Sequence, residues 1–404
     1  MPALPRTAWA EIDLDALVHN LGVLRSLVAP GVRVEPVVKA DAYGHGSVPV
    51  ARALQDAGAD GFGVATWDEA LELRRGGVTA PILVLYAIPA AAAREAALRG
   101  VAVSVGDMDL LERLAGAMAG ARSRRALRVH LGVETGLGRD GVTVASVVAA
   151  ARRIRATPGL RLAGLWTHLQ EPEDEGRTAA QEALLDAAAT ALRTAGLPVP
   201  DRHISASGDL LHLPVPAMEA IRPGLLLYGL ALDAVPADDV GRALAGPRDV
   251  PPVHPALSLH ARPMRVLDLP AGWGISYGPT FVTAHPSRIA TLPLGYADGW
   301  PRALSNRAEA LVRGHRVPIL GNVAMDAVMA DVTDVPGLPV TVDDEFVLIG
   351  RQGDDAITAG DVALTRGTIS REVVTGLSRR LPRVYDAAAG VAGIRTLVSE
   401  GRRA

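Results

Sequence analysis

Cysteine is missing from the 404-residue chain, which excludes disulfides, cysteine-bound metals and thiol nucleophiles. Neither charge is in large excess, because 41 lysine and arginine residues against 44 aspartate and glutamate residues leave a net charge of −3. The composition therefore gives no strongly basic character that would favour the binding of nucleic acid. No apolar segment of signal-peptide length lies between Met1 and Asp15, and no later uncharged apolar run approaches the roughly 20 residues of a membrane helix. With 49% apolar residues, we expect a globular, cytoplasmic protein that binds neither membrane nor nucleic acid.

Lysine is almost absent as well. Of the 41 basic residues only Lys39 is a lysine, and the other 40 are arginines. A composition rich in Ala, Gly, Arg and Val indicates that arginine has replaced lysine wherever it serves, so a surviving lysine is expected where arginine fails. Arginine fails where an amine must lose its proton or form an imine, because the guanidinium stays charged. Lys39 directly follows an apolar run at 34–38, so we favour a functional lysine at the end of a buried strand over an ordinary surface lysine.

Short apolar runs alternate with longer Ala/Leu/Arg-rich helical patterns over the first 221 residues. After a small strand at 10–14 and a helix at 16–28, strands are predicted at 33–38, 61–65, 81–86, 100–104, 127–133, 160–166, 202–205 and 218–221. Helices are predicted at 46–57, 67–75, 88–99, 107–119, 142–155, 176–195 and 208–213. Eight strands separated by helices favour an α/β fold with an eight-stranded, TIM-like (β/α)8 barrel. A doubly wound sheet stays possible because the last two strands are short.

A proline-rich segment at 233–256 separates this part from a different pattern. Beyond it, alternating strands are predicted at 256–267, 288–294, 309–312, 317–319 and 346–349, with a helix at 368–379. We therefore predict two domains, an α/β barrel over residues 1–240 and a mainly-β domain over residues 241–404.

Polar residues follow the predicted strands of the barrel. Lys39, Tyr43 and His45 come after the first strand, Arg139 after the fifth, His168 after the sixth, Ser205 and Ser207 after the seventh, and Arg222 and Gly224 after the eighth. Strand C-termini form one face of a barrel, so these groups are expected around one mouth. Their spacing fits neither a metal site nor a serine-nucleophile elbow nor a dinucleotide fingerprint. One reactive lysine with hydroxyls and backbone amides for a phosphate suits pyridoxal 5′-phosphate.

Residues 37–46, Val-Val-Lys-Ala-Asp-Ala-Tyr-Gly-His-Gly, resemble the cofactor-attachment site of alanine racemases. Ordered matches continue over both domains, at 10–13, 135–139, 222–224, 228–229, 276–278, 294–299, 324–326 and 380–385. The resemblance implies an eight-stranded barrel, a C-terminal β domain and a homodimer in which the partner's β domain completes each site. It also implies a pyridoxal-phosphate-dependent isomerase that interconverts L- and D-alanine, a peptidoglycan precursor.

The resemblance also implies a role for each matching residue. Lys39 would hold the cofactor and act as base on one face of the substrate, with Tyr277 of the other subunit on the opposite face. Arg222 would meet the pyridine nitrogen, and His168 would lie between Arg222 and Tyr277. Arg139 would orient the phenol and the substrate carboxylate. The phosphate would be held by Tyr43, Ser207, Gly224 and Tyr385, and the partner's substrate entrance would be lined by Met325 and Asp326.

The chain departs from the family pattern at two positions. Many relatives carry a carbamylated lysine that pairs with the loop arginine, where this chain has Gly132. Arg139 must then be held by another anion, such as Glu134 or a bound chloride. Ala206 replaces a usual asparagine near the phosphate.

Three alternative functions remain. One is a racemase of another small amino acid such as serine, and another is a pyridoxal-phosphate carrier, although carriers lack a β domain. The last is a barrel decarboxylase, although these use a partner cysteine.

Overall fold

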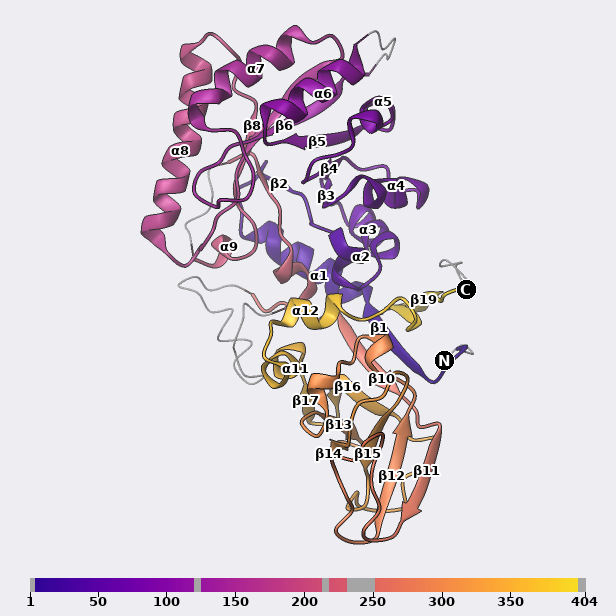
Figure 1. Cartoon of the computed structure of the whole chain (residues 1–404). Coiled ribbons are helices and arrows are strands. Elements are labelled where there is room, and N and C mark those ends of the chain that lie inside the picture. Colours follow the sequence, from indigo (N-terminus) through magenta and orange to yellow (C-terminus); the bar gives the residue numbers. More distant parts are fainter. Residues whose placement is uncertain (1–3, 120–124, 213–217, 231–250, 399–404) are drawn as a thin grey trace.

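The structure, a computed structural model, describes residues 4–119, 125–212, 218–230 and 251–398. The predicted domain boundary at 240 and most of the proline-rich segment lie outside the described residues. Among the helices in these ranges, none is both long and apolar enough to span a bilayer. Figure 1 shows an α/β part in indigo to pink above a β-rich part in orange, with two yellow helices between them.

The α/β part is built on parallel strands. A six-stranded parallel sheet has the order β3-β4-β5-β6-β7-β8, and a parallel pair is formed by β2 and β9. The strands are β2 (Arg33–Val34), β3 (Phe62–Val64), β4 (Ile82–Val84), β5 (Val101–Val105), β6 (Leu127–Gly132), β7 (Leu160–Trp166), β8 (Asp201–His203) and β9 (Ala220–Ile221). Every residue of β3, β4 and β5 is buried, as expected for strands covered on both faces.

Helices cover the outer face of this curled sheet (Figure 1). They are α1 (Leu14–Ser26), α3 (Ser47–Asp56), α4 (Trp67–Arg75), α5 (Ala93–Leu98), α6 (Met108–Met118), α7 (Val147–Ala156), α8 (Glu175–Thr194) and α9 (Asp209–His212). The helices begin at local sequence signals. Asp107 accepts a hydrogen bond from Leu110 N and so caps α6, and Thr66 with Glu69 forms a capping box at α4. The apolar sides of α4, α5, α6, α7 and α8 then pack on strands of the sheet.

The C-terminal part contains an eleven-stranded sheet of order β11-β12-β15-β14-β13-β16-β10-β1-β18-β19, with β17 paired to β16. Its strands are β1 (Ala8–Asp13), β10 (Leu257–Ala261), β11 (Arg265–Leu269), β12 (Ser287–Leu292), β13 (Glu309–Val312), β14 (His315–Leu320), β15 (Val328–Asp331), β16 (Phe346–Gln352), β17 (Asp355–Ile357), β18 (Arg383–Ala387) and β19 (Gly390–Arg395). The N-terminal strand β1 lies between β10, antiparallel, and β18, parallel. The first residues of the chain thus belong to the sheet of the second part.

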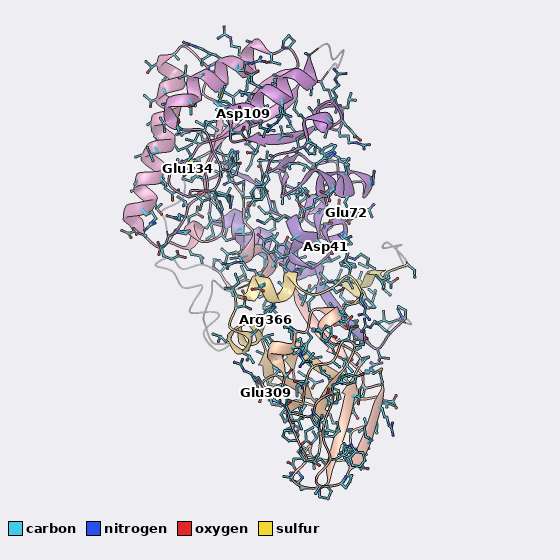
Figure 2. All side chains as sticks on the ribbon, in the orientation of Figure 1. Asp41, Glu72, Asp109, Glu134, Glu309 and Arg366 are labelled. Atoms are coloured by element: carbon cyan, nitrogen blue, oxygen red, sulfur yellow. The ribbon has the colours of Figure 1, made fainter. Side chains whose placement is uncertain are left out.

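Two helices of the C-terminal part, α11 (Ala359–Arg366) and α12 (Ser370–Thr375), lie at the junction with the α/β part (Figure 1). Side chains fill this junction in Figure 2, where Asp41 is labelled on the α/β side and Arg366 on the C-terminal side. The contact is close, because a Cβ at Gly44 would overlap the carbonyl of Val374 on α12. The C-terminal part therefore covers the segment that follows β2.

Each of the eight strand segments predicted for the α/β part contains a strand. In the C-terminal part the prediction was less complete. The segment 256–267 is two strands, β10 and β11, separated at residues 262–264, and the helix predicted at 368–379 is the shorter α12. Strands β15, β17, β18 and β19 and helix α11 were not predicted.

Candidate functional site

Lys39 opens an unusual turn. Residues Ala40 to Tyr43 all have positive φ, between 53° and 56°, so α2 (Lys39–Tyr43) is one left-handed turn rather than an ordinary helix. A left-handed conformation costs a non-glycine residue about 1–2 kcal/mol. Four such residues in a row need support from the surrounding structure, and strain of this kind is typical of functional sites.

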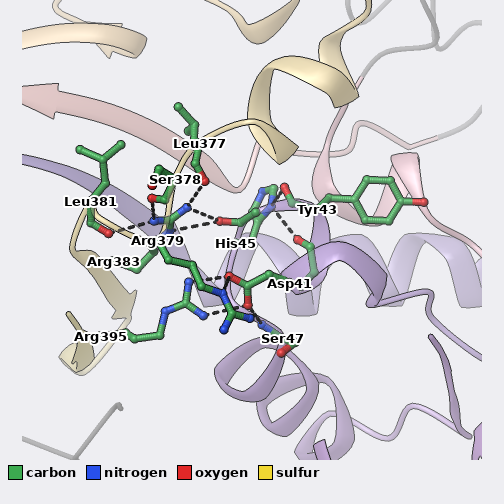
Figure 3. Close-up of polar contacts among 12 residues, drawn as sticks. Asp41, Tyr43, His45, Ser47, Leu377, Ser378, Arg379, Leu381, Arg383 and Arg395 are labelled. Atoms are coloured by element: carbon green, nitrogen blue, oxygen red, sulfur yellow. Dashed lines mark hydrogen bonds and ion pairs between the residues drawn. The ribbon is translucent and has the colours of Figure 1, made fainter. Parts of the chain in front are cut away.

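The support comes from the C-terminal segment (Figure 3). Arg395 donates two hydrogen bonds to the Asp41 carboxylate, at 2.8 and 2.6 Å, and Ser47 N donates a third at 2.9 Å. Arg383, fully buried, donates to the carbonyl of Gly44 at 3.1 and 3.2 Å. Burial tends to raise the pKa of Asp41, but the hydrogen bonds and charge of Arg395 outweigh it and leave the pKa below its usual value. The turn is thus held by an ionised carboxylate.

The Lys39 side chain lines a pocket of about 990 Å³. The lining residues come from the C-terminal ends of the α/β strands, as the barrel reading predicted, and from α11 and α12. Of the residues predicted from sequence, the pocket brings together Lys39, Tyr43, Arg139, His168, Ser207, Arg222 and Gly224. Burial, followed by the charge of Arg139, lowers the pKa of the Lys39 amine. A lowered pKa increases the fraction of neutral, nucleophilic amine at neutral pH.

A buried network fixes the Arg222 guanidinium. Arg222 donates to the carbonyls of Thr167 and Ile204, at 2.9 and 3.1 Å, and to Nδ1 of His203. Since Nδ1 of His203 accepts, its Nε2 carries the proton and donates to Nδ1 of His130 at 2.8 Å. Burial lowers the pKa of Arg222 to about 10, so the guanidinium stays charged at pH 7. The network therefore presents a rigid cation to the pocket.

Trp166 and His168 border this cation. The Trp166 ring lies 4.9 Å from the Arg222 guanidinium carbon. Burial, then the charges of Arg222 and Arg139, lowers the pKa of His168 to about 3. The His168 ring is therefore neutral at pH 7, and either ring nitrogen can take part in a hydrogen bond.

Hydroxyls and amides gather at another part of the pocket. The Ser207 hydroxyl accepts hydrogen bonds from the amides of Gly224 and Leu226, at 2.9 and 3.3 Å. A Cβ at residue 224 would lie 2.7 Å from the Tyr43 hydroxyl, so any larger residue there would displace this hydroxyl. A cluster of hydroxyls and backbone amides with no other side chain in the way is suited to binding the oxygens of an anion.

Glu134, one of the anions expected to hold Arg139, forms no ion pair with it in the described residues. The Glu134 carboxylate accepts from the amides of Gly136 and Gly138, at 2.5 and 3.1 Å, and so stabilises the glycine-rich loop. Within the described ranges Arg139 forms no ion pair, and its guanidinium carbon lies 5.3 Å from the centre of the Tyr86 ring. The aromatic face of Tyr86 is the contact that positions this cation.

Three predicted residues of the C-terminal part lie on the surface. Tyr277 is 78% exposed, Met325 is 52% exposed, and Asp326 accepts a hydrogen bond from Arg380 at 2.6 Å. The pocket of the same chain is lined by none of them. Their exposure agrees with a role toward another molecule rather than toward their own pocket.

Tyr385 differs from the expectation. It is 1% exposed, and its hydroxyl, which has no hydrogen-bond partner in the described structure, lies against Gly46. The residue packs behind the Lys39 turn instead of lining the pocket. Direct contact between Tyr385 and a phosphate therefore receives no support from this position.

Several residues that line the pocket or hold its side chains were not predicted from sequence. Tyr86 follows β4, as the other polar groups follow their strands, so the same signal could have found it. His203 ends β8 and could have been found likewise. Arg366 and Arg371 come from the C-terminal part, and no local pattern marks them.

Comparison with known proteins gives a consistent result over nearly the whole chain. Residues 12–232 match the family described as alanine racemase, N-terminal domain, and residues 256–385 match alanine racemase, C-terminal domain. An alanine racemase of Symbiobacterium thermophilum is 42% identical over 382 residues, which are 94% of this chain and 97% of that protein.

Solved structures agree. Alanine racemase from Bacillus anthracis with bound L-Ala-P is similar with a TM-score of 0.87 and 32% identity, over 97% of this chain and 98% of that one. Histidine racemase from Leuconostoc mesenteroides is similar with a TM-score of 0.83 and 30% identity, over 95% of this chain and 99% of that one.

Proposed function

Because the chain belongs to the alanine racemase family, we propose that it is an isomerase that interconverts L- and D-alanine with pyridoxal 5′-phosphate as cofactor. The observation that supports the proposal best is the position of the only lysine. Its amine lines a pocket of about 990 Å³ at the strand ends, and burial lowers its pKa. Such an amine can form and release a covalent bond to an aldehyde near neutral pH.

The residues present fit this cofactor. Lys39 would hold its aldehyde carbon, and the hydroxyls of Tyr43 and Ser207 would donate hydrogen bonds to its phosphate oxygens, beside the Gly224 amide that donates to Ser207. The absence of a Cβ at Gly224 lets the Tyr43 hydroxyl lie close to this part of the backbone, beside the proposed phosphate site. When bound, the cofactor withdraws electrons from the substrate Cα and so makes its proton acidic.

The side chains would divide the proton transfer between two faces of the substrate. The Lys39 Nζ atom takes or returns the Cα proton on one face, and the phenol oxygen of Tyr277, contributed by a second copy, acts on the other. Inversion at Cα needs such a pair, because the proton must leave one face and return to the opposite one. The neutral His168 ring would hold the Tyr277 hydroxyl, and Arg139 would orient the substrate carboxylate.

Arg222 would set the charge beside the pyridine nitrogen. Its guanidinium keeps its proton at pH 7 and is fixed by three acceptors, so it can donate a hydrogen bond but transfers no proton to the ring. An unprotonated ring withdraws electrons less strongly, which limits side reactions that need a long-lived carbanion.

A homodimer is part of the proposal. Exposed apolar side chains gather on the loops of the C-terminal part, where large apolar groups are usually buried; they are Trp273, Tyr277, Val282, Tyr296 and Met325. The loops are linked, because Asn322 donates to the carbonyl of Tyr277 at 2.9 Å and Tyr296 N donates to the carbonyl of Ala324 at 3.0 Å. A second copy that covers this surface would bring Met325 and Asp326 to its own substrate entrance.

The eight-stranded barrel also belongs to the proposal. Backbone hydrogen bonds from Val38 to Gly63 and from Glu219 to Arg202 connect the β2–β9 pair to both ends of the six-stranded sheet. These links favour closure of the eight strands around the pocket.

Incubation with L-alanine in deuterated water tests the reaction. We expect D-alanine to appear, deuterium to enter at Cα, and no carbon dioxide to be released. Lys39→Ala should remove both the visible absorbance of the bound cofactor and all turnover. Release of carbon dioxide, or an inert cofactor complex, would instead support a decarboxylase or a carrier. L-serine and L-histidine should be assayed in parallel, since a histidine racemase shares the fold.

Mixing two inactive variants tests whether Tyr277 acts across the dimer. Lys39→Ala and Tyr277→Phe are each expected to be nearly inactive. After the subunits are exchanged, each mixed dimer holds one site with both native groups, so about a quarter of the native sites should be restored. No recovery after exchange would show that Tyr277 does not act on the partner's substrate. The expected cytoplasmic location stays a prediction.

A further inference from the structure

Five arginines surround a hollow of about 440 Å³ in the α/β part of the chain. They are Arg74, Arg99, Arg125, Arg128 and Arg161. Pro81, Gly100 and Ala126 also line the hollow, and they directly precede β4, β5 and β6. The hollow therefore lies at the N-terminal ends of these parallel strands, at the edge of the sheet opposite the Lys39 pocket. Residues at this end of an α/β barrel ordinarily serve stability rather than chemistry, so a cluster of like charges there needs an explanation.

Backbone geometry brings four of these side chains together around Gly100. Arg128 donates a hydrogen bond to the Gly100 carbonyl at 2.9 Å, and Arg74 donates to the same carbonyl at 3.3 Å. A Cβ at Gly100 would lie 3.6 Å from Nη1 of Arg125. Arg161 is the residue directly opposite Arg128 in the parallel pair of β6 and β7. The cations thus share one small region instead of being spread over the surface.

Neutral acceptors orient the Arg74 guanidinium in this cluster. Arg74 donates to the carbonyls of Val78 and Ala80 at 2.8 and 2.7 Å, and to the carbonyl of Arg99 at 3.0 Å. A carbonyl fixes the direction of a guanidinium but leaves its full positive charge in place. The charge of Arg74 therefore adds to the cluster while its side chain stays fixed.

The carboxylates near the cluster compensate little of its charge. Glu95 pairs with Arg99 at 2.7 Å, but within the described ranges neither Arg128 nor Arg161 forms an ion pair. Burial, then the charge of Arg161, lowers the pKa of Arg128, and the charge of Glu35 offsets only part of this. Like charges this close repel each other, so the cluster costs stability as long as no anion lies among them.

We propose that this cluster is a binding site for a small anion that carries several phosphate groups. Arginine matches phosphate oxygens with two parallel hydrogen bonds, and side chains that are already oriented lose little freedom on binding. A single phosphate carries at most about two negative charges at pH 7, fewer than the positive charges around the hollow. The volume of the hollow lies in the range of small-molecule pockets, roughly 300–1,000 Å³. A short chain of phosphates therefore fits both the charge and the space.

Calorimetric titration of the full-length protein with sodium tripolyphosphate tests the proposal. We expect one ligand to bind per chain and Arg161→Gln to weaken binding about tenfold to a hundredfold, the range of one charge-assisted hydrogen bond. Arg161→Lys keeps the charge but loses the planar fork, so its affinity should be intermediate. As a control, Arg265→Gln removes an exposed arginine of β11 outside the hollow and should bind with native affinity.

Thermal unfolding separates ligand recognition from a structural role of Arg161, whose side chain is exposed. Without ligand, Arg161→Gln should unfold at the native temperature or above it, because a repulsive charge has been removed. Tripolyphosphate should raise the unfolding temperature of the native protein more than that of the variant. A ligand-free variant that unfolds at a lower temperature would show that Arg161 supports the fold, and the proposal would be wrong.

Two further ligands define the chemistry of the site. Orthophosphate should bind at least about tenfold more weakly than tripolyphosphate, because it compensates fewer of the cations. ATP carries the same phosphate chain on a nucleoside; equal affinity would show that the chain is recognised whatever it is attached to, and weaker binding would restrict the site to an inorganic chain.

Three results would overturn the proposal. The native protein could fail to bind tripolyphosphate. Arg161→Gln could bind it with native affinity, which would place the anion elsewhere, such as in the Lys39 pocket. Arg265→Gln could weaken binding as much as Arg161→Gln does, which would show a general response to net charge rather than a site.

Discussion

The ion pair between Asp41 and Arg395 offers a quantitative test of how the Lys39 turn is held. Both side chains are largely buried, with 12% and 13% of their surfaces exposed, and two hydrogen bonds join them. Replacement of Arg395 by Met leaves Asp41 facing only Arg379, at 3.4 Å, and the amide of Ser47. Loss of one partner of a buried pair costs about 3–5 kcal/mol, and since Arg379 remains we expect about 2–3 kcal/mol here.

Hydrogen exchange measures this loss at the turn itself. The four left-handed residues cost about 4–8 kcal/mol by their conformation, so a weaker clamp should allow the segment to open locally. We expect the amides of residues 40–47 in Arg395→Met to exchange about 30- to 160-fold faster than in the native protein, which is the same free energy expressed as a rate ratio. Affinity for the cofactor should fall in parallel, because Lys39 begins the turn.

Arg316→Met is a matched control. Arg316 makes a similar two-bond contact with Asp355, at 2.7 and 2.9 Å, but the side chains are 38% and 37% exposed. Exposed pairs contribute roughly 0–1 kcal/mol, so this variant should leave exchange at residues 40–47 unchanged. Native exchange in Arg395→Met would refute the reasoning, since the turn would then need no clamp from the C-terminal segment.

Three further outcomes are expected. Burial lowers the pKa of His130 to about 3, so as pH falls from 6.5 to 3 this residue gains a proton in the unfolded chain but not in the folded one. The free energy of unfolding should therefore fall by about 1.4 kcal/mol for each unit by which pH is lowered. Urea titrations of His130→Asn should show a weaker dependence of this free energy on pH. Gly224→Ala should weaken cofactor binding at least about tenfold, whereas Gly22→Ala, with no atom within 4 Å of the new Cβ, should stabilise α1 by roughly 0.5–1 kcal/mol. Tyr86→Leu should raise the substrate KM about two- to fivefold by releasing Arg139, while Tyr86→Phe should not.

The strands of the α/β part could be predicted from sequence because each is a short, fully apolar run such as Val101–Val105, bounded by a helical pattern. The position of Lys39 shortly after the first of these strands is equally local, although β2 ends at Val34 and not at residue 38 as predicted. So are Arg139, His168, Ser207 and Arg222, which follow their strands and therefore share one mouth. These predictions needed only the alternation of strand and helix.

The C-terminal part was harder to predict because its strands pair over long distances. The segment 256–267 reads as one alternating strand, yet Met264 N bonds to the carbonyl of Thr291 and the chain passes from β10 to β11. Strand β18 pairs on one side with β1, more than 370 residues away. No local pattern encodes such a partner.

By itself, the sequence determined the order of the strands along the chain, the position of the single lysine and the ring of polar groups after the strand ends, since all of these follow from neighbouring residues. Tertiary structure alone decided which distant groups reach that ring. It placed Arg371 in the pocket and Tyr385 behind it, because α12 docks on the Lys39 turn in one orientation. It also left Tyr277 on the surface, with 78% of its side chain exposed.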